Sequence, residues 1–175
     1  ASPDIVFALE DVAIVVKAAD NDRDPDGDPL TWEPITQPLN GTLTKSVNNY
    51  SYKGNPNYNG FDFFLYRVCD TSNKCAMSVV TIIIAPMNDQ PVAYNDTFTI
   101  LEDQTLVGNV LLNDYDADGD KLKTRVTQNP FNGTVQMDST GKFVYQPTTN
   151  YYGRDEFKYR ACDTARFFNC SQARV

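Results

Sequence analysis

The chain has 175 residues, a formal net charge of −8 and a sequence pI near 4.4. This acidity argues against nucleic acid as a partner, because binding to phosphates requires Lys and Arg. The composition is that of a globular protein, and no run of about 18 apolar residues is present that could insert into a membrane. The chain also lacks His, the commonest general base, so we do not expect an enzyme.

The sequence consists of one unit that occurs twice. The acidic stretch DPDGD at residues 24–28 recurs as DADGD at residues 116–120, a step of 116 − 24 = 92. Downstream, after one inserted residue, NYNGFDFFLYRVCD aligns with NYYGRDEFKYRACD at a step of 93. A repeat this regular predicts two tandem domains. We place them at residues 1–90 and 91–175, with the short, proline-bounded stretch APMNDQPVA as a stiff connector.

Each unit has the composition of a β-protein. Short β-branched and aromatic runs such as VAIVV, SVVTIII and FVY are separated by Asn-Gly, Asp-Gly and Pro turn signals. No stretch keeps a helical period. A repeat of about 90 residues with about seven short strands has the size of an immunoglobulin-like sandwich. We therefore expect an all-β chain with two tandem immunoglobulin-like β-sandwiches of about seven strands each.

The outward positions of the penultimate strand differ between the two units. In the second unit DEFKYRAC alternates between an aromatic face and a charged face, and the aromatic face is predicted to join the core. In the first unit the outward set is mostly apolar and includes Phe61, Phe63 and Leu65. A neighbouring loop or a glycan would cover such a patch, and the alternative is a partner surface.

Acidic residues gather where the predicted strands end. Only four of the 23 acidic residues are Glu, and the shorter Asp suits loops and oxygen-donor metal sites. Following the strands up and down a sandwich places an acidic crown at one end of each unit and an acidic base at the other. The crown of the first unit holds Asp24, Asp26, Asp28 and Asp70, and the base of the second unit holds Glu102 and Asp155.

The base of the first unit and the crown of the second are predicted to share an inter-repeat metal site. Two carboxylates about 4 Å apart repel by roughly 4 kcal/mol at an effective dielectric near 20, so the crowding requires a counter-ion. Calcium takes about six to eight oxygen ligands at once, whereas magnesium keeps its waters. We expect Ca²⁺, with two or three ions held by Glu10, Asp62, Asn88, Asp89, Asp116, Asp118, Asp120 and Asp163.

These motifs resemble those of cadherin-type repeats, including the cadherin-like repeats of large secreted adhesins. MNDQP is similar to the linker between repeats, DADGD to the crown calcium loop, Glu10 to the first-strand glutamate and Asp163 to the aspartate that closes the penultimate strand. NPNYNGFD stands where animal cadherins have an acidic Leu-Asp-Arg-Glu type motif, so either Asp62 substitutes or the junction binds fewer ions. The resemblance implies cadherin-like sandwiches that calcium stiffens.

Residues 22–33 also satisfy the EF-hand expression. An EF-hand needs a helix on each side, however, and here a β-branched run precedes the loop while Pro34 and Pro38 follow it. An Asp-rich calcium loop on a sandwich is the preferred interpretation. A solvated acidic turn without metal is the other alternative.

The four cysteines fall as one pair in each unit. They permit three connectivities, and repeat symmetry favours Cys69 with Cys75 and Cys162 with Cys170; a metal–thiolate site is the alternative. Disulfides imply an oxidising compartment, and in a eukaryotic source the chain would be a glycoprotein. Its sequons are at Asn40, Asn49, Asn95, Asn132 and Asn169, although Asn-Gly at residues 40 and 132 also fits hairpin turns.

We expect a two-repeat segment of a longer extracellular surface protein, in which calcium holds the shape of an adhesin or spacer. Its partners would be adjacent repeats of the same chain, together with a cell-surface protein, a glycan or, homophilically, a second copy. The alternative is a glycan-binding ancillary module of a secreted polysaccharide-active enzyme. Such a module would bind sugar through Trp32 or the Phe61–Leu65 face, although a Trp at the start of a strand is more often core.

Overall fold

The computed structural model describes residues 1–47, 49–164 and 169–175. The chain forms two compact units, Ala1–Met87 and Asn88–Val175. Both units consist almost entirely of β-strands, and the helical element of the described residues is the short 3-10 turn η1 (Val110–Leu112). No helix in the described part of the chain is long and apolar enough to cross a membrane. The predicted all-β fold is confirmed.

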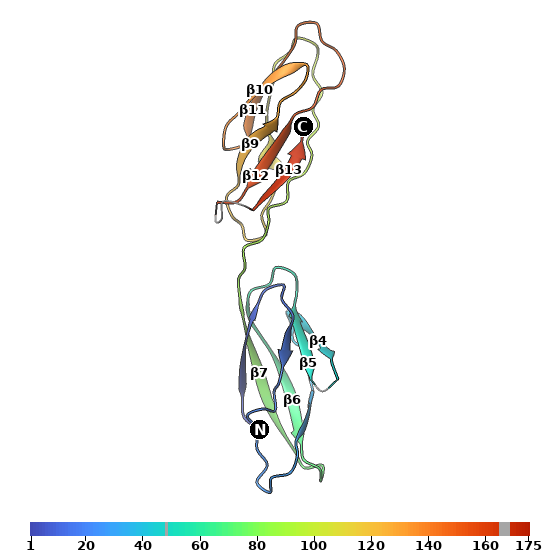
Figure 1. Cartoon of the computed structure of the whole chain (residues 1–175), viewed down its shortest axis with the longest axis vertical. Coiled ribbons are helices and arrows are strands. Elements are labelled where there is room, and N and C mark those ends of the chain that lie inside the picture. The colour runs from blue at the N-terminus through green and yellow to red at the C-terminus, as the bar shows by residue number, and fades with distance from the viewer. Residues whose placement is uncertain (48, 165–168) are drawn as a thin grey trace. The chain divides into compact units, whose positions relative to one another are not determined.

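The first unit is a sandwich of two sheets, and its strands β4 to β7 can be followed in Figure 1. β1 runs parallel to β7, and the other pairs are antiparallel. The first sheet has the order β1 (Asp4–Leu9), β7 (Cys75–Ala85), β6 (Gly60–Cys69) and β3 (Thr31–Pro34). The second has the order β2 (Ile14–Val16), β5 (Tyr50–Gly54) and β4 (Gly41–Lys45).

The core of the first unit follows from the period of two along β6. Phe64 and Tyr66 point inward and are fully buried, as is Ile82 of the neighbouring β7, because side chains on one face of a strand recur every second residue. Trp32 packs at the edge of this core, with its ring centroid 4.8 Å from that of Tyr50. Its position agrees with the core interpretation of this residue.

The second unit repeats the arrangement with six strands in its described residues. One sheet has the order β13 (Cys170–Arg174), β12 (Lys158–Cys162) and β9 (Lys123–Gln128), and the other has β10 (Gly133–Met137), β11 (Lys142–Pro147) and β8 (Leu106–Asn109). Residues 96–101, which align with β1, form no strand. Arg174, the last residue of β13, pairs with Lys158 as Val79 pairs with the equivalent Leu65, so β13 contains no counterpart of the β7 residues that pair with β1.

Both predicted disulfides are confirmed. Cys69 and Cys75 are bonded and face each other across the β6–β7 ladder, and Cys162 and Cys170 do the same across β12 and β13. Since all four sulfurs are used in this way, the metal–thiolate alternative is excluded. The bridges also close the turns in which Asp70 and Asp163 directly follow their strands.

Candidate calcium-binding loops

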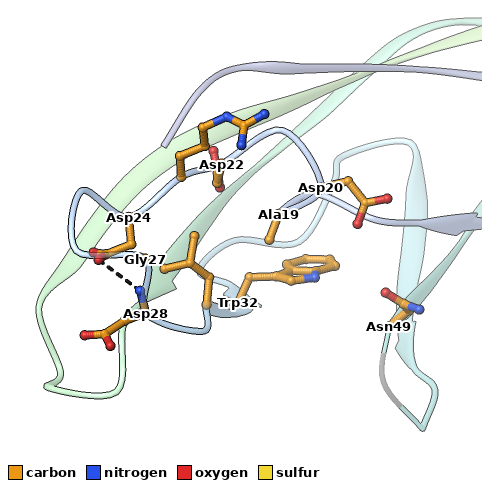
Figure 2. Close-up of a pocket in the computed structure, with 10 residues that line it drawn as sticks. Ala19, Asp20, Asp22, Asp24, Gly27, Asp28, Trp32 and Asn49 are labelled. Atoms are coloured by element: carbon orange, nitrogen blue, oxygen red, sulfur yellow. Dashed lines mark hydrogen bonds between the residues drawn. The ribbon is translucent and has the colours of Figure 1, made fainter.

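The Asp-rich loop of the first unit is a compact turn organised by one carboxylate. Asp24 Oδ1 accepts hydrogen bonds from the backbone N–H of Asp26 (2.8 Å) and of Asp28 (3.3 Å), and Figure 2 shows the second of these bonds. Gly27 stands between them with a φ of +80°, a left-handed conformation that glycine adopts without strain. The turn leaves the second oxygen of Asp24 and the carboxylates of Asp26 and Asp28 at one end of the sandwich.

The loop of the second unit has the same construction. Asp116 Oδ1 accepts from the backbone N–H of Asp118 (3.0 Å) and of Asp120 (3.3 Å), and Gly119 has a φ of +75°. Asp116 Oδ2 is buried and has no hydrogen-bond partner among the described residues. A buried carboxylate oxygen without a donor is unfavourable, so this atom is the best-supported metal ligand in the loop.

Three further residues of the second unit extend this acidic loop into a crown. Asn88 Nδ2 donates to Asp163 Oδ2 (2.9 Å), and the backbone N–H of Asp89 donates to Asp118 Oδ2 (2.7 Å). Asp163 is only 5% exposed, because it sits where β12 enters the disulfide-closed turn. The start of the second unit, which the sequence predicts as connector, is therefore held on the Asp-rich loop.

The electrostatics of this crown favour a cation. The pKa of Asp120 is raised by desolvation and then by the charges of Asp116, Asp163 and Asp118, so three neighbouring carboxylates act on Asp120. The two ion pairs among the described residues, Arg67–Glu33 and Arg174–Glu156, do not involve Asp116, Asp118 or Asp120. Several carboxylate oxygens gathered at one loop form a donor set that fits a hard cation such as Ca²⁺.

The crown of the first unit is completed by Asp70. Its carboxylate is 8% exposed, and Oδ1 accepts from the backbone N–H of Lys74 (2.8 Å) in the disulfide-closed turn. Beside the crown is an open hollow of about 510 Å³, in which Figure 2 shows Trp32 among acidic side chains. Its polar lining residues include Asp20, Asp22, Asp24, Asp28 and Asn49.

Two rival interpretations of this region are not favoured. Residues 22–33 are preceded by the strand β2, and their last residues already belong to β3 (Thr31–Pro34), so the EF-hand expression is matched without its helices. The Trp32 ring packs against Tyr50, Phe64 and Tyr66, and it is therefore engaged in the core rather than presented as a flat platform for a sugar.

The predicted base residues differ from one another in burial. Glu10 is 2% exposed, and its carboxylate accepts from the backbone N–H of Met87 and from Asn59 Nδ2 (3.3 Å). It therefore ties the last residue of the first unit to the end of β1. Glu102, its counterpart in the second unit, is exposed.

Asp62 has a structural role instead of the expected ligand role. Its carboxylate is 1% exposed and accepts from the backbone N–H of Leu39 and Asn40, both at 3.0 Å, and from the hydroxyl of Tyr52 at 2.9 Å. These donors occupy the oxygens inside the sandwich. We therefore remove Asp62 from the candidate metal ligands, because binding an ion would break the bonds that hold the β3–β4 connection.

Asp155 of the second unit repeats this network and receives the same correction. It accepts from the backbone N–H of Phe131 and Asn132 and from the hydroxyl of Tyr145, each at 2.9 Å. Burial alone would raise the pKa of Asp155, but the hydrogen bonds from these three residues outweigh it and lower the pKa below its ordinary value. Asp155 is therefore a charged anchor of the fold.

A second tyrosine network was not predicted from the sequence. The hydroxyl of Tyr66 donates to Asp22 (2.9 Å), and the hydroxyl of Tyr159, its counterpart, lies 3.0 Å from Asp114 and 3.4 Å from Asp96. Burial, followed by the charge of Asp114, raises the pKa of Asp96 to about 6. The signal available in the sequence was that both groups recur, Tyr66 as Tyr159 at a step of 93 and Asp22 as Asp114 at a step of 92.

Asp96→Asn is expected to stabilise the second unit at neutral pH. Because the folded-state pKa of Asp96 is raised, its contribution to stability is fully present below the unfolded pKa near 3.9 and is lost as pH rises through about 6. Solvent screening limits the gain to about 1 kcal/mol, or several degrees in the melting temperature. Thermal melts between pH 4 and 8 measure it. If the melting temperature of Asp96→Asn were shifted by the same amount at every pH, a raised pKa of Asp96 would be contradicted.

The fold and these loops together define a class, that of tandem immunoglobulin-like repeats of the cadherin type. The chain belongs to the bacterial Ig domain family, whose model matches it twice, at residues 1–83 and 88–175. Repeats of this fold are typically non-catalytic. A comparison with curated proteins gives no significant match.

Among solved structures, human CDH23 EC21-23 is similar over 99% of this chain and 70% of its own, with 15% identity and a TM-score of 0.55. Protocadherin Gamma B2 extracellular cadherin domains 3-6 is similar over 100% of this chain and 44% of its own, at 13% identity and a TM-score of 0.52. An endo-fucoidan hydrolase from glycoside hydrolase family 107 aligns with a TM-score of 0.38 and 19% identity, and the chain spans 27% of its length. The likeness to the cadherin structures shows the fold.

Proposed function

We propose that the chain is a calcium-binding tandem-repeat segment of an extracellular surface protein, in which bound calcium stiffens an adhesin or spacer. The acidic crown of the second unit carries this proposal, because Asp116 Oδ2 is buried without a donor among the described residues and three neighbouring carboxylates act on Asp120. The cadherin ectodomain neighbours and the two disulfides support an extracellular or surface location.

Calcium would act by holding shape. Asn88 and Asp89 already contact Asp163 and Asp118, so an ion bound in this crown would fix the first residues of the second unit to its Asp-rich loop. Asp116, Asp118, Asp120 and Asp163 would supply carboxylate oxygens, and Asn88 an amide oxygen. Glu10 stays a proposed contributor on the sequence alone. Asp24, Asp26, Asp28 and Asp70 form the equivalent set in the first unit.

The test is a calorimetric calcium titration of the chelator-stripped protein at physiological salt, run beside Asp116→Asn. Saturable binding with dissociation constants from micromolar to millimolar is expected. In Asp116→Asn at least one binding event should be lost or weakened by about tenfold or more. Asp138→Asn is the matched control, because it removes one charge from an exposed turn of the same unit. An absence of calcium binding by the wild type would overturn the proposal.

A further inference from the structure

The outward face of the first unit's larger sheet is apolar over three adjacent strands. On β1 Ile5 is 66% and Phe7 73% exposed, and on β6 Phe61 is 69%, Phe63 52% and Leu65 42% exposed. These residues alternate with buried ones, so they stand on the side of the sheet opposite to the core. The exposure of Phe61, Phe63 and Leu65 agrees with the outward position predicted from the sequence. Ile5 and Phe7 of β1 enlarge the apolar patch.

The strand register joins these side chains into continuous rows. Phe7 pairs with Ile83 of β7, which in turn pairs with Phe61, so three apolar residues cross the sheet at one level. Directly opposite positions on a sheet face bring Cβ atoms to about 5 Å, which is contact distance for such side chains. Ile5 and Phe63 flank Thr81 in the next row. We call these residues the β1–β7–β6 face.

The second unit shows that this fold does not require an apolar surface here. At the positions equivalent to Phe61, Phe63 and Leu65 it has Arg154, Glu156 and Lys158. Glu156 forms an ion pair with Arg174 of β13. Arg154 and Glu156 precede β12, and Lys158 is its first residue. At these three positions the second unit is therefore charged where the first unit is apolar, so the repeat does not require apolar residues there.

The size of the face matches what one copy contributes to a protein interface. With exposed fractions of 73%, 69% and 52%, the three phenylalanines alone present roughly 400 Å² if each side chain offers about 200 Å². The exposed aliphatic neighbours Ile5, Leu9, Leu65 and Ile35 bring the total to roughly 700–800 Å². About 800 Å² per partner is the standard size, and the largest patch on a typical monomer is about 300–600 Å².

The charge distribution indicates which partner fits. The face itself contains no charged side chain, and Arg67, the next outward residue of β6 after Leu65, is paired with Glu33. A basic or acidic partner would find nothing to pair with, and a polar glycan would find few hydrogen-bonding groups. An identical apolar sheet is complementary, because a two-fold interface requires a patch that matches itself.

We propose that two copies of this chain associate through the β1–β7–β6 face of the first unit, packing sheet against sheet. The inference goes beyond the proposed calcium function and does not depend on it, because no acidic crown residue lies on this face. The phenylalanine rows would form the centre of the interface, and the Arg67–Glu33 pair would stand at its rim.

The test is sedimentation velocity from about 1 to 100 µM, in calcium and in chelator, with Phe61→Arg/Phe63→Glu/Leu65→Lys beside the wild type. This triple variant installs the residues found at the equivalent positions of the second unit, and the three side chains that it replaces are exposed, so it should fold. Phe131→Ser is the control, since it removes an aromatic side chain that is 84% exposed elsewhere.

We expect a dimer with a micromolar dissociation constant for the wild type and the control, in both buffers, and a monomer for the triple variant. A monomeric wild type at 100 µM would overturn the proposal, whether or not the face binds another protein or a glycan. So would a triple variant that still dimerises, or a dimer that needs calcium. Loss of calcium binding with an intact dimer would instead count against the proposed function alone.

Discussion

Replacing Asp62 with alanine is expected to lower the free energy of unfolding of the first unit by about 3–5 kcal/mol. The carboxylate is 1% exposed and receives the N–H groups of Leu39 and Asn40 and the hydroxyl of Tyr52. Its removal leaves these donors without an acceptor in the protein interior. A loss of this size approaches the total stability of a small domain.

The loss in free energy of unfolding can be measured by urea denaturation in chelator. Hydrogen exchange of peptides from the first unit is used to monitor the unfolding. Tyr52→Phe removes one donor together with its bond and should cost only about 1 kcal/mol. Asp26→Ala, an exposed acid in the same unit, should stay within about 0.5 kcal/mol in chelator. If Asp62→Ala behaved like Asp26→Ala while calcium binding was lost, Asp62 would be a ligand as first expected, and our correction would be wrong.

The network around Asp155 also has a pH signature. Because its folded-state pKa is lowered, its contribution to stability is present above the unfolded pKa near 3.9 and is lost as pH falls through the folded value. Acid below about pH 4 should therefore weaken the second unit through this residue. Asp96 acts in the opposite direction near pH 6, so the two aspartates can be distinguished by their pH ranges.

Most of the fold, and most of the acidic crown, could be predicted from the repeat in the sequence. Aligning the two copies was enough to predict two β-sandwiches, the pairing of Cys69 with Cys75 and the matching Asp-rich loops. These features depend on residues close together in the chain, where turn chemistry and strand alternation act directly. The loops around Gly27 and Gly119 accordingly have the same conformation.

The roles of Asp62 and Asp155 were missed, although a signal was present. Asp62 shares the inward alternation of Phe64 and Tyr66, so its side chain had to enter the sandwich. Its position at the start of the penultimate strand predicts instead that it lies with the ion ligands at the base of the unit. Its donors, from Leu39 to Tyr52, come from segments whose meeting depends on the sheet register, which a single sequence does not reveal.

The full extent of the apolar face was missed for the same physical reason. Phe61, Phe63 and Leu65 were visible as an outward set along one strand, but Phe7 lies more than fifty residues away and joins them only through Ile83 of β7. Parallel pairing of the first and last strands of a unit brings the two ends of its sequence together. The alternation of side chains along one strand predicts which residues face outward. Which residues of other strands lie beside them depends on how the strands are paired.

Calcium is expected to raise the free energy of unfolding of the second unit by about 2.7 kcal/mol at a hundredfold excess over its dissociation constant. It should also slow hydrogen exchange of the Asp89 amide, which donates to Asp118, because the ion would hold both residues in one crown. Asp116→Asn should abolish both effects, or reduce them to about half or less if binding is only weakened. The equivalent substitution in the first unit, Asp24→Asn, should leave them intact, since the offset of 92 places it in the other crown. Calcium protection that survives Asp116→Asn would place the ion elsewhere. Protection that is lost in both variants would mean that the effect is not specific to the crown of the second unit.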